Sequence, residues 1–315
     1  MSILNWLKQR YFDARILLRY GTLYPEVVDL PGGEHMVCVD PRDPRARKLV
    51  VTNPLRGRFP RNQQFWRFAC ESLAPQTAID IGANFGECLY TAYYPPQTLV
   101  LGVEANPQLL GYLEESRRLH PDGDRIHLRQ VLAGEETGPA ADFFIHTTWS
   151  GGSTATAAIA EGDQRFQKVS VPVETVDNLI RQTQPLPLDR QQIVFKIDVE
   201  GFEGHVLRGM TRTLSHCRAA LGMMEFDTRM LTAAGEKIED FWACLEQLFT
   251  IYVFTSDSEA RPAPRGNFAV VQEWLSGMKQ HTDLVLLRGE WPAAEQLLNQ
   301  RWVSDAVQLN TRNVA

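Results

Sequence analysis

The segment AIDIGANFGE, residues 78–87, carries the strongest local signal in this chain of 315 residues. Its apolar start is typical of a short buried strand ending near Asp80, and Gly82, Asn84 and Gly86 follow at alternate positions. Glycine tolerates positive φ and leaves room for a ligand close to the backbone. A helix beginning here would offer free N–H groups and the positive end of its dipole. The segment therefore predicts a strand, a glycine-rich turn and a helix around a ligand.

Strands and helices alternate from this segment onward. The predicted strands are residues 77–81, 98–104, 125–132, 193–199, 219–225, 251–255 and 283–288, and the predicted helices are residues 85–94, 107–119, 205–214 and 241–249. Such alternation is typical of an α/β fold with a doubly wound, mostly parallel sheet. In these sheets ligands bind outside the carboxyl ends of the strands, at the topological switch point.

The flanking segments predict three parts. Residues 1–75 form an N-terminal helix and an α+β cap, with helices at 3–20 and 62–73 and strands at 35–40 and 48–52. Residues 76–290 form the main domain, and residues 291–315 a C-terminal helical tail. Within the main domain, strand-like residues 142–147 and 168–174 flank the loop WSGGSTAT, residues 149–156. Long irregular loops in compact domains are usually functional or disordered, so we expect a lid on the substrate side, with a disordered surface loop as the alternative.

Composition excludes several classes of protein. The chain has a net charge of −6 and 44% apolar residues, which is ordinary for a globular protein and disfavours nucleic-acid binding. It has no run of about 18 apolar residues, so no transmembrane helix is expected. The cysteines, at positions 38, 70, 88, 217 and 244, form no CxxC pair, which disfavours disulfides and structural zinc. We expect a reduced, cytoplasmic protein.

The first helix, residues 3–20, has an apolar face and a basic one. Lys8, Arg10, Arg15 and Arg19 lie on the basic face. This helix either packs on the domain or on a partner subunit of a homo-oligomer, or it lies weakly on an anionic membrane surface.

The glycine-rich turn differs from a dinucleotide site. A pyrophosphate site has the spacing G-x-G-x-x-G, whereas this turn reads G-x-N-x-G after Asp80. The ligand implied lacks a pyrophosphate and carries a cationic group, and S-adenosylmethionine fits that description. Glu104 ends the next strand, where an acid accepts hydrogen bonds from ribose hydroxyls. Tight packing of the turn and a solvated Glu104 are the structural alternatives.

The segment FKIDVEGFEG, residues 195–204, adds charged residues at the end of the fourth strand. Lys196 and Asp198 share one strand face, because side chains alternate with period two. Glu200 and Glu203 follow in the turn and the first helical step, where the helix dipole favours negative charge.

Four segments together resemble one known family: DIGANFG, VEANP, TVDNLI (residues 175–180) and FKIDVEGFEGHVLRG. Through these segments the chain resembles the FkbM family of S-adenosylmethionine-dependent methyltransferases. The resemblance covers about residues 77–225. It implies the Rossmann-like, seven-stranded class I methyltransferase sheet, whose last strand pair includes an antiparallel strand. It also implies O-methylation of a hydroxyl on a sugar, glycan or secondary metabolite.

The resemblance also implies which residues bind the cofactor. Asp80, Gly82, Asn84 and Gly86 would line its methionine half, and Glu104 would hold its ribose. Val131 and Leu132, at the end of the third strand, would flank the adenine. Lys196, Asp198, Glu200 and Glu203 match the family's fourth-strand motif.

The catalytic candidates follow from the chemistry of methyl transfer to an alcohol, whose proton must be accepted or acidified. Asp198 is the first candidate, as a general base or as a ligand of a divalent cation. Glu225 is a companion carboxylate, and Mg²⁺ suits such ligands. Lys196 and Glu200 complete the group of catalytic candidates. His205 and His146 are further candidate bases. Alternatively, His205 is an exposed histidine in the first turn of a helix.

Two other functions remain open for this sequence. One is an NAD(P)-dependent oxidoreductase on the same type of sheet, against which the missing G-x-G-x-x-G counts. The other is a non-catalytic S-adenosylmethionine-binding protein, in which the fourth-strand acids would be idle. A nucleic-acid methyltransferase is disfavoured by the acidity and by the lack of an NPPY-like tetrad.

Overall fold

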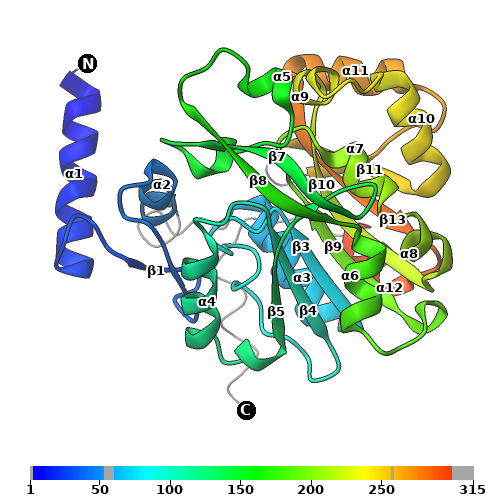
Figure 1. The fold of residues 1–315 in the computed structure, drawn as a ribbon, viewed down its shortest axis with the longest axis horizontal. Helices are drawn as coiled ribbons and strands as arrows, with labels where there is room; N and C mark the ends of the chain where they lie inside the picture. Colours follow the sequence, from blue (N-terminus) through cyan, green and yellow to red (C-terminus); the bar gives the residue numbers. More distant parts are fainter. Residues whose placement is uncertain (1–2, 53–59, 257–258, 300–315) are drawn as a thin grey trace.

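The computed structural model describes residues 3–52, 60–256 and 259–299, and its centre is an eight-stranded sheet (Figure 1). The strand order is β12-β11-β13-β10-β9-β3-β4-β5. These strands are β3 (Thr77–Ile81), β4 (Leu99–Glu104), β5 (Ile126–Gln130), β9 (Gln192–Ile197), β10 (Ala219–Asp227), β11 (Thr250–Ser256), β12 (Glu259–Pro262) and β13 (His281–Arg288). From β10 to β5 all neighbours are parallel, whereas β13 is antiparallel to both β10 and β11.

This topology confirms the doubly wound, mostly parallel α/β sheet and its antiparallel strand. The chain leaves β3 toward β5 on one side and returns to β9 and β10 on the other, so the switch point lies between β3 and β9. The eighth strand, β12, was not predicted. Among the described strands it pairs with β11 alone, at the sheet edge, and its sequence EARP has no apolar alternation that would indicate a strand.

Helices lie on both faces of the sheet and in the segments beside it. They are α1 (Ile3–Tyr20), α2 (Pro44–Thr52), α3 (Arg61–Leu73), α4 (Leu110–Leu119), α5 (Ala157–Ala160), α6 (Val176–Thr183), α7 (Glu203–Arg208), α8 (Thr211–His216), α9 (Thr228–Ala233), α10 (Ile238–Leu248), α11 (Phe268–Gly277) and α12 (Pro292–Asn299). Successive strand residues enter opposite cores: Ala78 packs with α3 and the N-terminal segments, and Ile79 with α6, α10 and α11. Burial on both faces explains why the central strands are nearly all apolar.

Two smaller sheets flank the main one. β1 (Val27–Asp29) and β2 (Met36–Cys38) pair antiparallel near α4. β6 (Leu132–Ala133), β7 (Gly138–His146) and β8 (Phe166–Glu174) form a three-stranded sheet in the order β6-β8-β7, close to the ends of the central strands (Figure 1). The two predicted strands around the small-residue loop are therefore paired with each other.

The prediction of a strand at residues 48–52 is wrong, because these residues belong to α2. Asp43 accepts the backbone N–H of Arg45 through its side chain at 2.8 Å, and Pro44 is the first helical residue. An aspartate followed by proline is a frequent helix start, which outweighs the strand preference of Val50 and Val51.

The helix predicted at residues 85–94 is also absent, and its place is taken by a series of turns. Asn84 and Gly86 have φ of 52° and 82°, which interrupts a right-handed helix at its start. The backbone bonds Gly86 N–H to Ala83 O and Thr91 N–H to Cys88 O then close over three residues, and the bond Tyr90 N–H to Gly86 O forms an isolated turn over four. No regular helix therefore supplies a dipole at this turn.

Two further elements are divided. The strand predicted at residues 125–132 ends at Gln130, and Leu132 pairs with Val173 in the small sheet. The helix predicted at 205–214 is split into α7 and α8 at Gly209. A Cβ there would lie 2.0 Å from the carbonyl oxygen of Gly134, so this residue packs directly on the neighbouring backbone. The helix predicted from residue 107 begins at Leu110.

The ends of the described chain differ in how they pack. α1 extends away from the main body, and Trp6, Leu7, Tyr11 and Leu18 on it are exposed (Figure 1). In the described part of the chain no helix is long and apolar enough to cross a membrane. At the other end α12 packs against α3 and contributes Leu298 to the core. The rest of the predicted tail, residues 300–315, lies outside the described residues.

Candidate functional site

A pocket opens where β3, β4 and β9 end, which is the predicted switch-point edge. Its walls combine the strand ends with α2 and with the loop after β7. The lining residues are Arg45, Ile81, Gly82, Asn84, Val103, Glu104, Ala105, Val131, Leu132, Ala133, Phe143, Ser150, Gly151, Ser153, Asp198, Val199 and Glu200. Gly82, Asn84, Glu104, Val131, Leu132, Asp198 and Glu200 were predicted as site residues. The fold thus brings these seven predicted residues together from four separate segments of the sequence.

The glycines of the turn are required by close packing. Gly82 has φ of 80°, and a Cβ on it would lie 1.9 Å from the backbone oxygen of Asp198. A Cβ on Gly86 would lie 2.3 Å from the ring of Tyr90. Gly82 therefore lets the end of β9 approach the turn, and this contact brings Asp198 into the wall of the pocket. Gly86 lies outside that wall.

Glu104 is buried at the end of β4 and is held by two backbone groups. Its Oε2 accepts the N–H of Asn84 and its Oε1 accepts the N–H of Asn106, both at 2.8 Å. Burial raises the pKa of Glu104, and these two hydrogen bonds oppose the rise. Because each oxygen uses one acceptor position on the backbone, each keeps a second position for a ligand in the pocket.

Asp80 and Lys196 form a buried pair behind the turn and do not line the pocket. Lys196 Nζ lies 3.2 Å from Asp80 Oδ1, 3.3 Å from the carbonyl oxygen of Gly82 and 3.3 Å from Asp198 Oδ2. Burial raises the pKa of Asp80 to about 6, although Lys196 opposes the shift. Burial alone would lower the pKa of Lys196, but Asp198 and Asp80 outweigh it and raise the pKa. This pair joins β3, which carries Asp80, to β9, which carries Lys196, and it orients Asp198.

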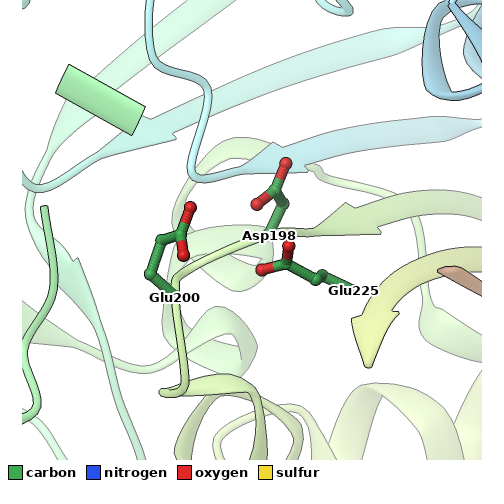
Figure 2. Close-up of side chains that lie close together, drawn as sticks. All are labelled: Asp198, Glu200 and Glu225. Carbon is green, nitrogen blue, oxygen red and sulfur yellow. The ribbon is translucent and has the colours of Figure 1, made fainter. Parts of the chain in front are cut away.

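Asp198, Glu200 and Glu225 converge at the ends of β9 and β10 (Figure 2). One oxygen from each carboxylate lies within 4.8 Å of the others. Burial would raise the pKa of Asp198, but Lys196 and Arg45 outweigh it and lower the pKa. Burial, and then repulsion within this group, raise the pKa of Glu200 well above its usual value and that of Glu225 to about 7. The group can therefore hold the ionised Asp198 beside Glu225, which accepts or releases a proton near neutral pH, and beside Glu200, whose raised pKa favours its protonated form.

His281, at the start of β13, was missed by the sequence analysis. Its Nε2 lies 2.9 Å from Glu225 Oε1, and this hydrogen bond raises the pKa of His281. The other oxygen of Glu225 is buried and has no partner in the described part of the chain. Only the antiparallel pairing of β13 with β10 brings His281 here, and no local motif marks it.

The remaining candidates lie outside the pocket. Glu203 Oε1 accepts the N–H groups of Val199 and Gly201 at 3.2 Å each, so it stabilises the turn after β9. His205 stacks on Phe202 with a ring distance of 4.2 Å, and its Nδ1 lies 3.5 Å from Glu135.

The small-residue loop covers the glycine-rich turn. Ser150 Oγ donates to Asn84 Oδ1 at 3.1 Å, and Ser150 N–H donates to Asp43 Oδ2 at 3.0 Å. Thr154 Oγ1 donates to the carbonyl oxygen of Glu200 at 2.8 Å. His146 lies at the base of this loop against Phe166 and outside the pocket wall.

Arg45 and Phe143 also line the pocket and were not predicted. Arg45 belongs to α2, and the Asp43–Pro44 signal could have revealed that helix but not its position over the pocket. Phe143 belongs to β7, whose strand pattern was recognised but whose contact with Leu132 required the folded chain.

Comparison with known proteins gives a consistent picture. The model of the methyltransferase FkbM domain matches residues 80–250. Among solved structures, the methyltransferase FkbM from Methylobacillus flagellatus is similar over 73% of this chain, with 16% identity and a TM-score of 0.43. The match covers 48% of that protein, so the chain spans about half its length. No curated protein sequence matches the chain.

Two other solved structures are similar at comparable levels. A putative O-methyltransferase from Klebsiella pneumoniae has 12% identity over 73% of this chain and 80% of its own, with a TM-score of 0.41. The O-methyltransferase from Bacillus cereus, solved in complex with S-adenosylhomocysteine, has 10% identity over 74% of this chain and 82% of its own, with a TM-score of 0.41.

Proposed function

Because the chain belongs to the FkbM methyltransferase family, we propose that it transfers a methyl group from S-adenosylmethionine to a hydroxyl group of a sugar, glycan or secondary metabolite. The observation that carries the cofactor assignment is the buried Glu104 carboxylate, held by two backbone N–H groups at the switch-point edge. A carboxylate at this position is suited to the two hydroxyls of a ribose.

The rest of the pocket fits the same cofactor. Val131, Leu132 and Phe143 form an apolar wall beyond Glu104, which suits an adenine ring. Asp198 and Glu200 also line the pocket, and their carboxylates would stabilise a cationic ammonium and sulfonium. The pyrophosphate of a nicotinamide dinucleotide binds at a G-x-G-x-x-G turn that opens a helix, whereas this turn reads G-x-N-x-G and is followed by further turns, which favours this proposal over the oxidoreductase alternative.

The cofactor, when bound, supplies an already activated methyl group, so the chain contributes position and proton handling. The acceptor hydroxyl would lie beside the carboxylates at the ends of β9 and β10. Asp198 is ionised and accepts a hydrogen bond from that hydroxyl, while Glu225, with its pKa of about 7, receives or relays the proton. Lys196 acts through Asp198, whose position it holds.

A divalent cation is the alternative to this base. The three carboxylates offer the hard oxygen ligands that Mg²⁺ prefers. Glu200 and Glu225 would then be ionised together, which the cation's charge makes possible.

The surface of helix α1 indicates where in the cell the enzyme would encounter its acceptor. Its exposed apolar residues include Trp6 and Tyr11, whose rings lie beside Arg10 and Arg15, and this combination suits the surface of an anionic membrane. We therefore propose a glycan or glycolipid assembled at such a surface as the acceptor class.

Calorimetric titration with S-adenosylhomocysteine and with NADH, each with Mg²⁺ and with EDTA, tests the proposal. We expect one molecule of S-adenosylhomocysteine to bind per chain and NADH not to bind. Binding of NADH alone would overturn the assignment. Turnover is then measured as S-adenosylhomocysteine release with hydroxylated acceptors, and NMR of a ¹³C-labelled methyl group identifies the atom that receives it. Labelling on nitrogen or carbon would refute O-methylation, and activity in EDTA would refute the cation.

A further inference from the structure

One positive charge faces this otherwise acidic pocket. Among the lining residues that the structure describes, Arg45 is the cation, and Glu104, Asp198 and Glu200 are the acids. Arg45 comes from the N-terminal segment, outside the span matched by the family model. Its role is therefore not contained in the motifs that identify the family.

The side chain of Arg45 is held firmly in place. Its Nε donates to Glu87 Oε1 at 2.8 Å, its Nη2 donates to the same oxygen, and the Glu87 side chain is only 5% exposed. Burial would lower the pKa of Arg45, but Glu87 and Asp198 outweigh it and raise the pKa, so the guanidinium stays charged. Asp43 fixes the backbone, because it binds the N–H of Arg45 with one oxygen and the N–H of Ser150 with the other.

The third nitrogen of the guanidinium remains available. Arg45 Nη1 has no hydrogen-bond partner among the described residues, whereas Nε and Nη2 are both used by Glu87. A Cβ on Gly151 would lie 2.5 Å from this Nη1, so the glycine leaves the space that the nitrogen occupies. The pocket thus holds a preorganised donor with a positive charge.

We propose that Arg45 binds the α-carboxylate of the methionine part of the cofactor. This inference rests on the proposed function and deepens it. S-adenosylmethionine carries one anionic group, and a carboxylate placed in this acidic pocket without a cation would be strongly disfavoured. The ammonium and the sulfonium suit Asp198 and Glu200, which leaves the carboxylate for Arg45. Helix α2 and the 150–152 loop are then parts of the cofactor site.

The test combines a change in the ligand with a change in the protein. Decarboxylated S-adenosylmethionine keeps the adenosine, sulfonium and ammonium groups and lacks only the carboxylate. Both ligands are titrated by calorimetry into the wild-type protein, Arg45→Met and the control Arg47→Met. Arg47 lies on the same helix but pairs with Asp13, away from the pocket.

We expect the wild-type protein to bind S-adenosylmethionine about 10–100 times more tightly than the decarboxylated ligand, the range for one charged hydrogen-bonded pair. Arg45→Met should remove that preference by weakening S-adenosylmethionine binding alone. Arg47→Met should retain it. The double variant Arg45→Met/Glu87→Gln, which leaves no unpaired charge on Glu87, repeats the measurement if the single variant does not fold.

Two results would overturn the inference and leave the proposed function standing. One is a wild-type protein that binds both ligands equally well. The other is an equal loss of both ligands in the Arg45 variants, which would make Arg45 a purely structural residue. Failure of the wild-type protein to bind either ligand would instead refute the proposed function together with this inference.

Discussion

The backbone N–H of Asn84 donates to Glu104 Oε2 at 2.8 Å, which joins the glycine-rich turn after β3 to the end of β4. Asn84 has φ of 52°, and this left-handed conformation turns its N–H toward the carboxylate. The acid expected to bind the ribose is thus also what holds the turn. The site is therefore formed in the free chain, and its residues serve both stability and binding.

Glu104→Gln tests this double role. The amide keeps the shape of the side chain but turns an N–H₂ group toward one of the two backbone donors, so one hydrogen bond is replaced by a repulsive contact. We expect binding of S-adenosylhomocysteine to weaken about 10–100-fold, and the free energy of unfolding to fall by about 1–3 kcal/mol. Calorimetry and urea unfolding measure the two effects. Glu115→Gln, on the exposed side of α4, is the control, and unchanged affinity in Glu104→Gln would refute the ribose assignment.

Lys196→Met should be among the most destabilising single changes at this site. It leaves the fully buried Asp80 without its cation, and breaking a buried ion pair in this way costs about 3–5 kcal/mol. The double variant Asp80→Asn/Lys196→Met removes the unpaired charge and should regain a large part of the loss. Urea unfolding of the three proteins measures this coupling. Additive losses would show that the pair makes no contribution of its own.

Asp198→Asn should reduce turnover while the fold is kept. The amide cannot accept a proton or serve as an anionic ligand, so a fall in kcat of about 10²–10⁴-fold is expected. Release of S-adenosylhomocysteine measures kcat, and circular dichroism checks the fold. Asp142→Asn, on an exposed strand position paired with Lys168, serves as the control. Full turnover in Asp198→Asn would remove this residue from the mechanism.

Glu203 should make the protein less stable as the pH rises. Burial raises its pKa from 4.5 to about 8, so between these values the folded chain holds a proton that the unfolded chain has lost. Since the folded state binds more protons, the free energy of unfolding falls with increasing pH, by at most about 1.4 kcal/mol per unit for this group. Glu203→Gln keeps the carbonyl oxygen that accepts the Val199 N–H and should flatten this slope. Urea unfolding from pH 5 to 8.5 measures both profiles, and identical slopes would contradict the prediction.

The role suggested for α1 is tested with vesicles. We expect the chain to cosediment with vesicles of phosphatidylglycerol and less with phosphatidylcholine, and added salt to weaken the binding. Leu7→Glu/Leu18→Glu changes two exposed residues and should abolish it. Glu161→Gln, an exposed residue on another part of the surface, is the control. Equal binding to both lipids would exclude the electrostatic part of this idea.

Local patterns in the sequence were enough for the centre of the fold. Continuous apolar runs mark β3, β4, β9 and β10, because strands buried on both faces have little choice of residue. The order of these strands and their polar ends then place Glu104 and Asp198 at one edge. These residues were predictable because each lies at the end of a strand whose position the sequence reveals: Glu104 is the last residue of β4, and Asp198 directly follows β9.

The tertiary structure decided the rest, since it depends on contacts between distant segments. Nothing near Arg45 in the sequence shows that α2 lies over the pocket; Asp43 and Ser150, 107 residues apart, bring it there. His281 reaches Glu225 through the pairing of β13 with β10, whereas His205, directly after the fourth-strand motif, faces Glu135 outside the pocket. The sequence by itself determined which side chains lie at the ends of the central strands, because the positions of these strands follow from the periodicity and burial of their apolar residues. Only the folded chain decided which distant side chains meet them, because that depends on how whole elements pack.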